Sequence, residues 1–316
     1  MKIFVTGASG TLGSRAVDRL LRAGHDVTAL VRSDGARARL ERAGARAVQG
    51  SLFDPEALRT ALAGHDAVVN LATHIPSAAD AIKPGAWRED DRIRTEGSRM
   101  LAGAALAAGV GRLVQEAVSF VYPDSGDSWI TEQTQPAPNP KSQAATMAAT
   151  ATVTRFAALG GVGVVLRFGL MYGPDRNSRE MLARARAGKP VVLGKPAGWL
   201  SPVHPEDAAR AVAAALACDS GTYNVCETPV LRSDWAAAIG RAARAEATAG
   251  TTAKFYPPLL QRLAGARAEP LARSHRVSSA AFSRATGWCP HYDCLRGGWS
   301  DSPAVPSPTV ARPSPD

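Results

Sequence analysis

The 316-residue chain has no hydrophobic run long enough to cross a membrane. A membrane-spanning helix needs at least about 18 consecutive apolar residues, and every apolar stretch here is interrupted sooner. The chain also opens directly on Ile3, Phe4 and Val5, without the basic and apolar regions of a secretory signal. We therefore expect a cytoplasmic protein that has no membrane partner.

Cysteine is scarce. The four cysteines are Cys218, Cys226, Cys289 and Cys294, and the last two flank His291. A structural zinc site needs four ligands, whereas this stretch offers three. A cytoplasmic protein keeps unpaired thiols reduced. The sequence therefore predicts free thiols and no metal site.

Lysine and aromatic residues are also few. Only six of the 37 basic residues are lysines, and aromatic residues make up 6% of the chain. The net charge of +9 comes from arginines that are scattered among alanine and glycine. No predicted helix carries the basic stripe with interleaved aromatic residues that favours nucleic-acid binding. We therefore expect no nucleic-acid partner.

The chain does have a strong alternation of strand and helix patterns. Its apolar content of 45% is enough for a large core. Short β-branched runs predict strands at 2–6, 26–31, 45–50, 67–71, 112–117 and 163–168. Amphipathic windows predict helices at 11–23, 36–43, 55–63, 92–108 and 144–159. Right-handed βαβ crossovers then predict an α/β fold with a doubly wound parallel sheet, the Rossmann fold.

This alternation becomes less regular after Tyr172. Helices are predicted near 179–187, 205–217 and 233–243, with short strands near Val191 and Tyr223. We expect a Rossmann domain at 1–172, with 200–225 returning to it. A smaller C-terminal lobe at 173–199 and 226–299 should cap the substrate at the carboxyl edge of the sheet. Residues 300–316 are rich in proline and serine, which predicts a disordered tail.

The first strand leads into residues 6–13 (TGASGTLG), a G-x-x-G-x-x-G loop that opens a helix. Gly7 suits the tight turn, Gly10 lets the backbone approach a pyrophosphate, and Gly13 permits close packing of helix on strand. The N-terminus of the helix offers free N–H groups and a partial positive charge to phosphates. This context predicts dinucleotide binding by Gly7, Ser9, Gly10, Thr11, Leu12 and Gly13.

The residues that follow the second strand indicate which dinucleotide binds. An acidic residue there would bind the adenosine ribose hydroxyls, whereas a basic one favours a 2′-phosphate. Arg32 stands at this position, with Arg37 and Arg39 close behind. We therefore predict NADP(H) as the cofactor, although Arg32 is alternatively a solvated charge at a strand end. Further contacts are predicted at the ends of later strands, from Ser51, Leu52, Leu71, Ala72, Thr73 and Phe168.

With these motifs the sequence resembles the extended or atypical short-chain dehydrogenase/reductases, a superfamily of NAD(P)-dependent epimerases, dehydratases and ketoreductases. The resemblance covers nearly all of residues 1–300. It rests on the order and spacing of several motifs: the glycine loop, Leu71-Ala72, Val121-Tyr122, Arg167-Phe168-Gly169, Tyr172-Gly173-Pro174, and Val203 to Asp207 before a helix.

The resemblance breaks at the catalytic residues. Members usually carry Tyr-x-x-x-Lys at the start of the helix after strand five, and a Ser or Thr at the end of that strand. Alignment on the helix places Ser142 at the tyrosine position and Thr146 at the lysine position. Counting back from Tyr122, the nearest fit to the Ser/Thr position is Val118, with Ala117 and Ser119 on either side. No tyrosine occurs between Tyr122 and Tyr172. The usual proton transfer by tyrosine is therefore not available to this chain.

Three residues are candidates for the remaining chemistry. Tyr122 lies just past strand five and is a candidate acid, Ser119 would orient the substrate, and His74 titrates near neutrality. The alternatives are that Tyr122 packs at a strand end and that His74 is a surface residue with no role.

Three functions fit the sequence. The first is an NADP(H)-dependent oxidoreductase or isomerase that acts on a small carbonyl-bearing metabolite with a non-standard proton donor. The second is a redox-neutral cyclase, epimerase or dehydratase that uses the cofactor structurally or transiently. The third is a non-enzymatic NADP sensor. We expect a small molecule as the substrate, and a homodimer is the oligomeric state that we consider.

We expect NADP(H) to bind at least about tenfold more tightly than NAD(H), because one charge-assisted contact contributes about 1.5 to 3 kcal/mol. Calorimetry with both cofactors measures the two affinities directly. Equal affinities, or an Arg32→Ala variant with an unchanged preference, would contradict the assignment of Arg32.

Overall fold

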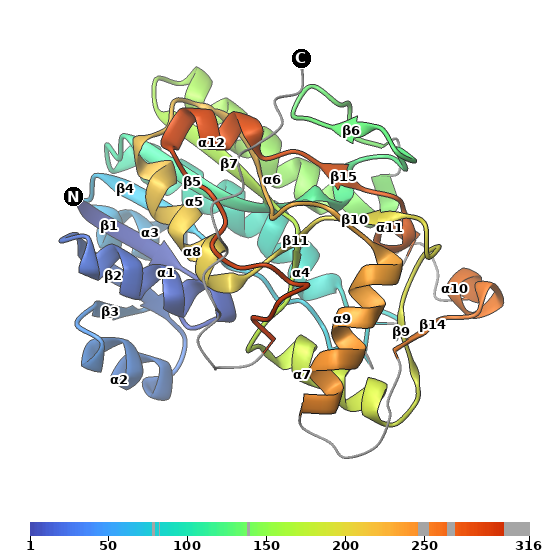
Figure 1. Ribbon diagram of the computed structural model, residues 1–316. Coiled ribbons are helices and arrows are strands. Elements are labelled where there is room, and N and C mark those ends of the chain that lie inside the picture. The colour runs from blue at the N-terminus through green and yellow to red at the C-terminus, as the bar shows by residue number, and fades with distance from the viewer. Residues whose placement is uncertain (78–79, 82, 138–139, 246–252, 264–268, 300–316) are drawn as a thin grey trace.

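Seven parallel strands form the central sheet of the protein, in the order β12-β7-β5-β4-β1-β2-β3 (Figure 1). The computed structural model describes residues 1–77, 80–81, 83–137, 140–245, 253–263 and 269–299. The predicted tail at 300–316 lies outside this range. The predicted doubly wound α/β fold is confirmed. The strands are β1 (Lys2–Thr6), β2 (Asp26–Val31), β3 (Arg46–Gln49), β4 (Ala67–Asn70), β5 (Arg112–Val118), β7 (Val162–Phe168) and β12 (Gly221–Val225).

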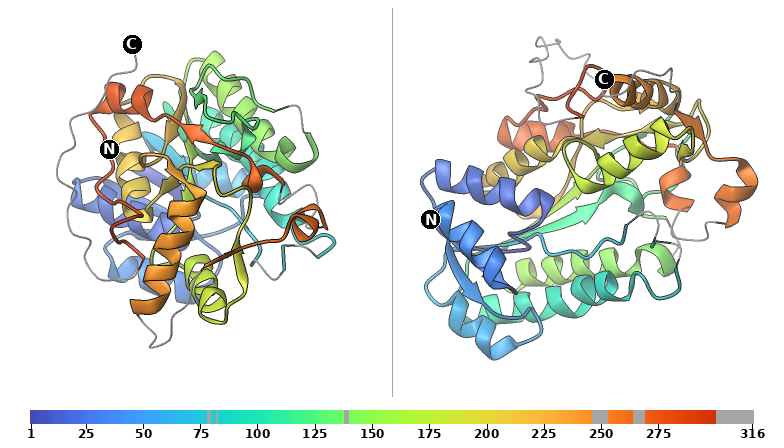
Figure 2. Two further views of the ribbon diagram at one scale, coloured as in Figure 1. Left: turned by 45° about the vertical axis from the view of Figure 1, so that its right-hand side comes forward. Right: turned by 90° about the horizontal axis from the view of Figure 1, so that it is seen from below.

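Helices cover both faces of the sheet, as the right panel of Figure 2 shows. One face packs against α1 (Thr11–Arg22), α2 (Asp34–Arg42), α8 (Pro205–Ala214) and α12 (Ala280–Thr286). The other packs against α3 (Pro55–Leu62), α5 (Ser98–Ala107) and α6 (Pro140–Ala158). In β1, Ile3 and Val5 belong to the first core and Phe4 to the second. Burial on both faces explains why the strands read as continuous apolar runs.

Several helices start earlier than predicted, among them α6, which spans Pro140–Ala158 where 144–159 was expected. The helix expected at 92–108 starts earlier, as α4 (Arg88–Arg92), and passes through the π-helical turn η1 (Ile93–Gly97) before α5. Helix α2 starts two residues before the predicted position because the Ser33 hydroxyl accepts a hydrogen bond from the Ala36 amide and caps it. Neither feature changes the apolar period from which the helices were predicted.

A smaller lobe lies beyond the carboxyl ends of β5 and β7 (Figure 1). Its core contains Leu182, Trp235 and Ile239, and α7 (Arg176–Arg186) packs on α9 (Arg232–Ala245). Short strands join distant segments in pairs: β6 (Trp129–Ile130) with β15 (Arg276–Val277), β8 (Leu170–Met171) with β11 (Pro202–Val203), β9 (Pro190–Val192) with β14 (Lys254–Phe255), and β10 (Trp199–Leu200) with β13 (Val230–Leu231). The short elements η2 (Ser119–Val121), η3 (Ala215–Ala217), α10 (Pro258–Leu263) and α11 (Glu269–Ala272) complete the described structure.

Within the described residues, no helix combines the length and the apolar character that a membrane span requires. All four cysteines are free, and three of them are buried.

A buried cluster of charges lies near the end of β5. The Arg94 guanidinium, on η1, donates through Nε to Asp90 Oδ2 at 2.9 Å and through Nη1 to Glu116 Oε2 at 2.8 Å. All three side chains are at most 8% exposed. Burial opposes the charge on Arg94, but the carboxylates of Glu116 and Asp90 raise its pKa. The cluster therefore fixes α4 and η1 against the sheet.

We expect Arg94→Met to lower the free energy of unfolding by about 3 to 5 kcal/mol, because it leaves two buried carboxylates without a counter-charge. Urea denaturation measures the change. Arg59→Met is the control, since the Arg59 and Glu56 side chains are 55% and 78% exposed, and such pairs contribute at most about 1 kcal/mol. Similar losses in the two variants would contradict the structural importance of the cluster.

Candidate functional site

The glycine loop joins β1 to α1 and lies against the end of β4. Gly7 has a positive φ of 68°, and a Cβ there would overlap the Leu71 carbonyl. A Cβ on Gly13 would overlap the Gly7 carbonyl in turn. The Gly10 amide closes the turn by donating to Gly7 O at 3.0 Å. The loop therefore needs glycine at positions 7 and 13 for backbone geometry and close packing alone.

The N-terminus of α1 is open to an anion. Its first residue is preceded by Gly10, which offers no side-chain cap, and the first turn contains no acidic residue. Ser9, Gly10 and Thr11 are exposed, whereas Leu12 is buried. The free N–H groups and the helix dipole thus face outward without competition from a carboxylate. This arrangement fits the pyrophosphate of a dinucleotide.

Polar contacts hold the strand ends beside the loop. Asn70 Oδ1 accepts a hydrogen bond from Thr6 Oγ1, and Asn70 Nδ2 donates to Gln115 Oε1 at 2.8 Å. Asn70 Oδ1 also accepts from the Ala72 amide at 3.3 Å. One buried side chain therefore fixes the ends of β1, β4 and β5 and the start of the turn after β4.

The other predicted cofactor contacts differ in exposure. Arg32 and Ser51 are exposed, Ala72 and Thr73 are half-buried, and Leu52 and Leu71 are buried at 9% and 6%. Phe168 is 1% exposed and lies in the core between the sheet and α8. Its side chain therefore has almost no surface to offer a ligand in this structure.

Tyr122 is fully buried, at 0% exposed. Its hydroxyl donates to Asn224 Oδ1 and accepts from Arg167 Nη1, both at 2.8 Å. Burial raises the pKa of the phenol. Ser119, in η2, is also buried at 1%. These contacts agree with the alternative from the sequence, that Tyr122 packs at a strand end.

His74 is the one of the three candidate catalytic residues whose side chain is exposed. Its amide donates to Asp90 Oδ1 at 2.8 Å, so the buried charge cluster also holds the turn after β4. The neighbouring Ile75 is 50% exposed, which is unusual for a large apolar residue in this chain. The turn thus presents one titratable and one apolar side chain to solvent.

The positions of the usual catalytic pair lie near the start of α6. Ser142 and Thr146 are one helical turn apart there, and Thr146 is 5% exposed. Val118, at the end of β5, has no hydroxyl to orient a substrate. The residues that stand where a tyrosine, a lysine and a serine are expected therefore include no acid that titrates near neutral pH.

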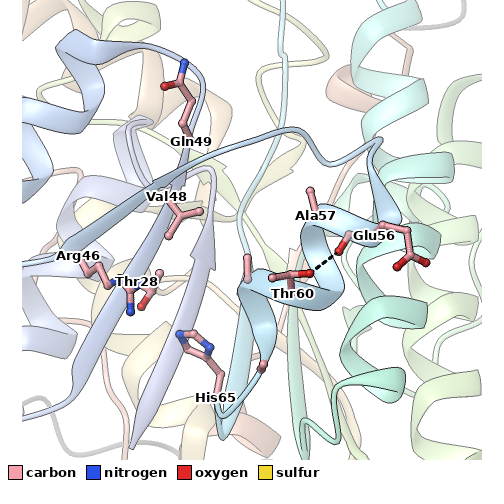
Figure 3. A pocket seen from close by; sticks show the side chains of 10 residues that line it. Thr28, Arg46, Val48, Gln49, Glu56, Ala57, Thr60 and His65 are labelled. Carbon is pink, nitrogen blue, oxygen red and sulfur yellow. Dashed lines mark hydrogen bonds between the residues drawn. The ribbon is translucent and has the colours of Figure 1, made fainter.

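A cavity of about 590 Å³ lies outside the predicted site, along β2, β3 and α3 (Figure 3). Thr28 and Arg46 line its sheet side, and Thr60 and His65 line the opposite side. None of the predicted site residues lines it. Within the described residues, no three His, Cys, Asp or Glu side chains gather where they would hold a metal ion.

Sequence analysis missed two sets of positioning residues, namely Asn70 with its partners and the Asp90, Arg94 and Glu116 cluster. A signal for both was present. Gln115 and Glu116 interrupt the apolar residues of β5, and Asn70 ends β4, a strand that is buried throughout. Polar residues inside such strands need partners, because an unpaired buried polar group is costly.

Residues 3–226 match the NAD dependent epimerase/dehydratase family. A 3-diazoavenalumate denitrifying reductase from a Streptomyces species is 32% identical over 310 residues, and the match covers 94% of this chain and 99% of that protein. A 2-alkyl-3-oxoalkanoate reductase from Shewanella oneidensis is 31% identical over 229 residues, with 67% of this chain and 56% of that protein covered.

Two solved structures share the fold. The UDP-glucose 4-epimerase of Thermotoga maritima, solved with UDP-glucose, has a TM-score of 0.76 at 19% identity and covers 95% of this chain and 96% of its own. The UDP-glucose 4-epimerase of Thermus thermophilus, solved with NAD, has a TM-score of 0.74 at 22% identity. The match covers 95% of this chain and 97% of that chain. At these identities the likeness concerns the fold alone.

We expect Tyr122→Phe to lower the free energy of unfolding by about 1 to 3 kcal/mol, because Arg167 and Asn224 each lose a buried partner. Urea denaturation measures this change. Tyr223→Phe is the control, because the Tyr223 hydroxyl makes only a 3.3 Å bond to Asp219 O near the surface. Unchanged stability together with a large loss of activity would instead restore Tyr122 as the catalytic acid.

Proposed function

Because the chain belongs to the NAD dependent epimerase/dehydratase family, as its motifs predicted, we propose that it is an NADP(H)-dependent reductase whose substrate needs no proton from a tyrosine. The observation that carries this proposal is the absence of the usual catalytic acid. Ser142 and Thr146 stand in place of the family's tyrosine and lysine. The hydroxyl of Tyr122 is hydrogen-bonded to Arg167 and Asn224.

The cofactor side of the proposal rests on the loop and on the end of β2. The open N-terminus of α1 and the loop residues Gly7 to Gly13 would hold the pyrophosphate. Arg32 is exposed at the end of β2, where it would meet a 2′-phosphate. When bound there, NADPH supplies a hydride. The same arrangement supports the sequence-based choice of NADP(H) over NAD(H).

The missing acid limits which substrates can be reduced quickly. Reduction of a carbonyl places a proton on oxygen, and loss of a positioned acid costs about 10² to 10⁴ in rate. Reduction of an aryl diazonium ion does not lose rate in this way, because it needs no acid. Hydride forms a C–H bond at the ring carbon, the C–N bond breaks, and its electron pair leaves with N₂. The substrate gains two electrons, and no proton is consumed.

The relative from Streptomyces supports this substrate class. Its name describes a reductase that removes nitrogen from a diazo compound, and the match runs over 99% of that protein. We therefore propose that the substrate is an aromatic diazo compound, used as its diazonium form. The chain's own part is to bind it beside the cofactor and to exclude water, not to transfer a proton.

A second candidate is reduction of a ketone, with His74 as the proton donor. It is favoured by the exposure of His74 and by the 2-alkyl-3-oxoalkanoate reductase among the relatives. Histidine is the side chain that most often serves as a general acid or base in enzymes. The two candidates differ in one measurable respect, the dependence of the rate on a protein acid.

The test uses the full chain with NADPH and a diazotised amino-hydroxybenzoate as the probe. We expect NADPH oxidation in step with formation of the nitrogen-free arene, and deuterium from nicotinamide-deuterated NADPH should appear on the ring. Reaction without protein sets the background. Turnover of ketones only, with an about 10² to 10⁴-fold loss in His74→Ala, would replace the proposal by the second candidate.

Other outcomes would identify the remaining functions. Conversion of a substrate without net oxidation of NADPH indicates a redox-neutral epimerase, cyclase or dehydratase. Cofactor binding without conversion of any probe favours the sensor function that the sequence also allows. Both results would contradict the reductase proposal.

A further inference from the structure

Small side chains on α3 leave the cavity along β2, β3 and α3 open. Leu58 and Leu62 of this helix are buried in the core against the sheet. Ala57 and Ala61 instead line the cavity, and they lie on one face of the helix because they are one turn apart. Val48 of β3 lines the sheet side. The cavity therefore has an apolar wall on the helix and another on the strand (Figure 3).

Polar side chains gather at one end of the cavity, where Figure 3 shows Arg46, Thr28 and His65. Thr28 of β2 is the register partner of Arg46 on β3, so both side chains lie on the same face of the sheet. His65 follows α3, and its ring contacts Phe4 edge-on with the ring centroids 5.5 Å apart. A guanidinium, a hydroxyl and an imidazole from three separate segments thus meet at this end.

The charge at this end is positive. Arg46 is exposed, and among the ion pairs of the described residues none includes it. The carboxylate of Glu56, which also lines the cavity, is paired with Arg59 at 2.9 Å. Burial lowers the pKa of His65, and the positive charges of Arg46 and Lys2 act in the same direction. At neutral pH a ligand would therefore meet one free cation beside a neutral imidazole.

We propose that this cavity is a second binding site, and that its ligand is a flat organic carboxylate. The Arg46 guanidinium binds the carboxylate, because its planar fork matches the two oxygens of that group. The planar body lies between Val48 on the strand and the two alanines on the helix. A volume of about 590 Å³ is in the range of small-molecule sites. No residue predicted to bind the cofactor or to act in catalysis lines the cavity, so the inference does not depend on the proposed function.

The experiment is an NMR titration of the histidine rings of the full chain, with 2-naphthoate and its uncharged analogue 2-naphthamide as probes. A His65→Gln variant assigns the ring signals of His65. We expect 2-naphthoate to shift these signals with a Kd of about 1 mM or lower, and to leave the ring signals of His74 in place. The amide should bind at least about tenfold more weakly, because it cannot form the charge-assisted pair. Saturating NADPH should leave the shift unchanged.

Three variants locate the probe within the protein. Arg46→Gln should weaken 2-naphthoate at least about tenfold and remove its advantage over the amide. Arg42→Gln is the matched control, since it removes an exposed arginine from α2 on the other face of the sheet, and it should change the affinity by less than about twofold. Ala57→Phe should prevent binding of both probes, because the added ring occupies the cavity. Ala57 is exposed, so this variant should fold and melt like the wild type.

Four results would overturn the inference. Equal affinities for the two probes, or an unchanged affinity in Arg46→Gln, would show that Arg46 does not recognise a carboxylate. Shifts at His74 in place of His65, or displacement of the probe by NADPH, would place it at the predicted site rather than in the cavity. The absence of any saturable shift would equally remove this ligand class.

Discussion

The close contact of the glycine loop with the end of β4 is the constraint on which the site depends. Gly7 lies where a side chain would overlap the Leu71 carbonyl, and Gly13 lies directly over Gly7. This contact places the N-terminus of α1 beside the turn after β4, and Asn70 then ties the neighbouring strand ends to each other. The glycine loop and the turn after β4 are thus held together at one edge of the sheet.

The strands and the glycine loop could be predicted because their signals are local. β1 shows continuous burial on both faces, and the loop shows fixed glycine spacing between a strand and a helix. Packing of Tyr122 at a strand end was one of the sequence-based alternatives, but the hydrogen-bond partners of its hydroxyl could not be predicted in this way. Its partners Arg167 and Asn224 stand 45 and 102 residues away and meet it only in the folded sheet. The two-residue strands of the smaller lobe were missed because they are too short to show a period.

The positions of the supporting contacts explain how a member of this family can keep its fold without the usual catalytic tyrosine. The contacts that support the sheet ends are made by Asn70 with its partners and by the Arg94 cluster, and Thr146 takes part in neither. The residues proposed to bind the cofactor and the positions of the usual proton-transfer pair are therefore separate sets. A substrate that carries its own leaving group can use the first set without the second.

The paired short strands of the smaller lobe determine how the protein can be assembled. β6 and β15 bring Trp129 beside Arg276, and β9 and β14 bring Pro190 beside Lys254. Each pair closes a long loop, which costs entropy before its few contacts form. We therefore expect the lobe to fold after the sheet. We also expect that the lobe would not fold after transfer to another protein, because β8, which pairs with β11, follows directly on sheet strand β7.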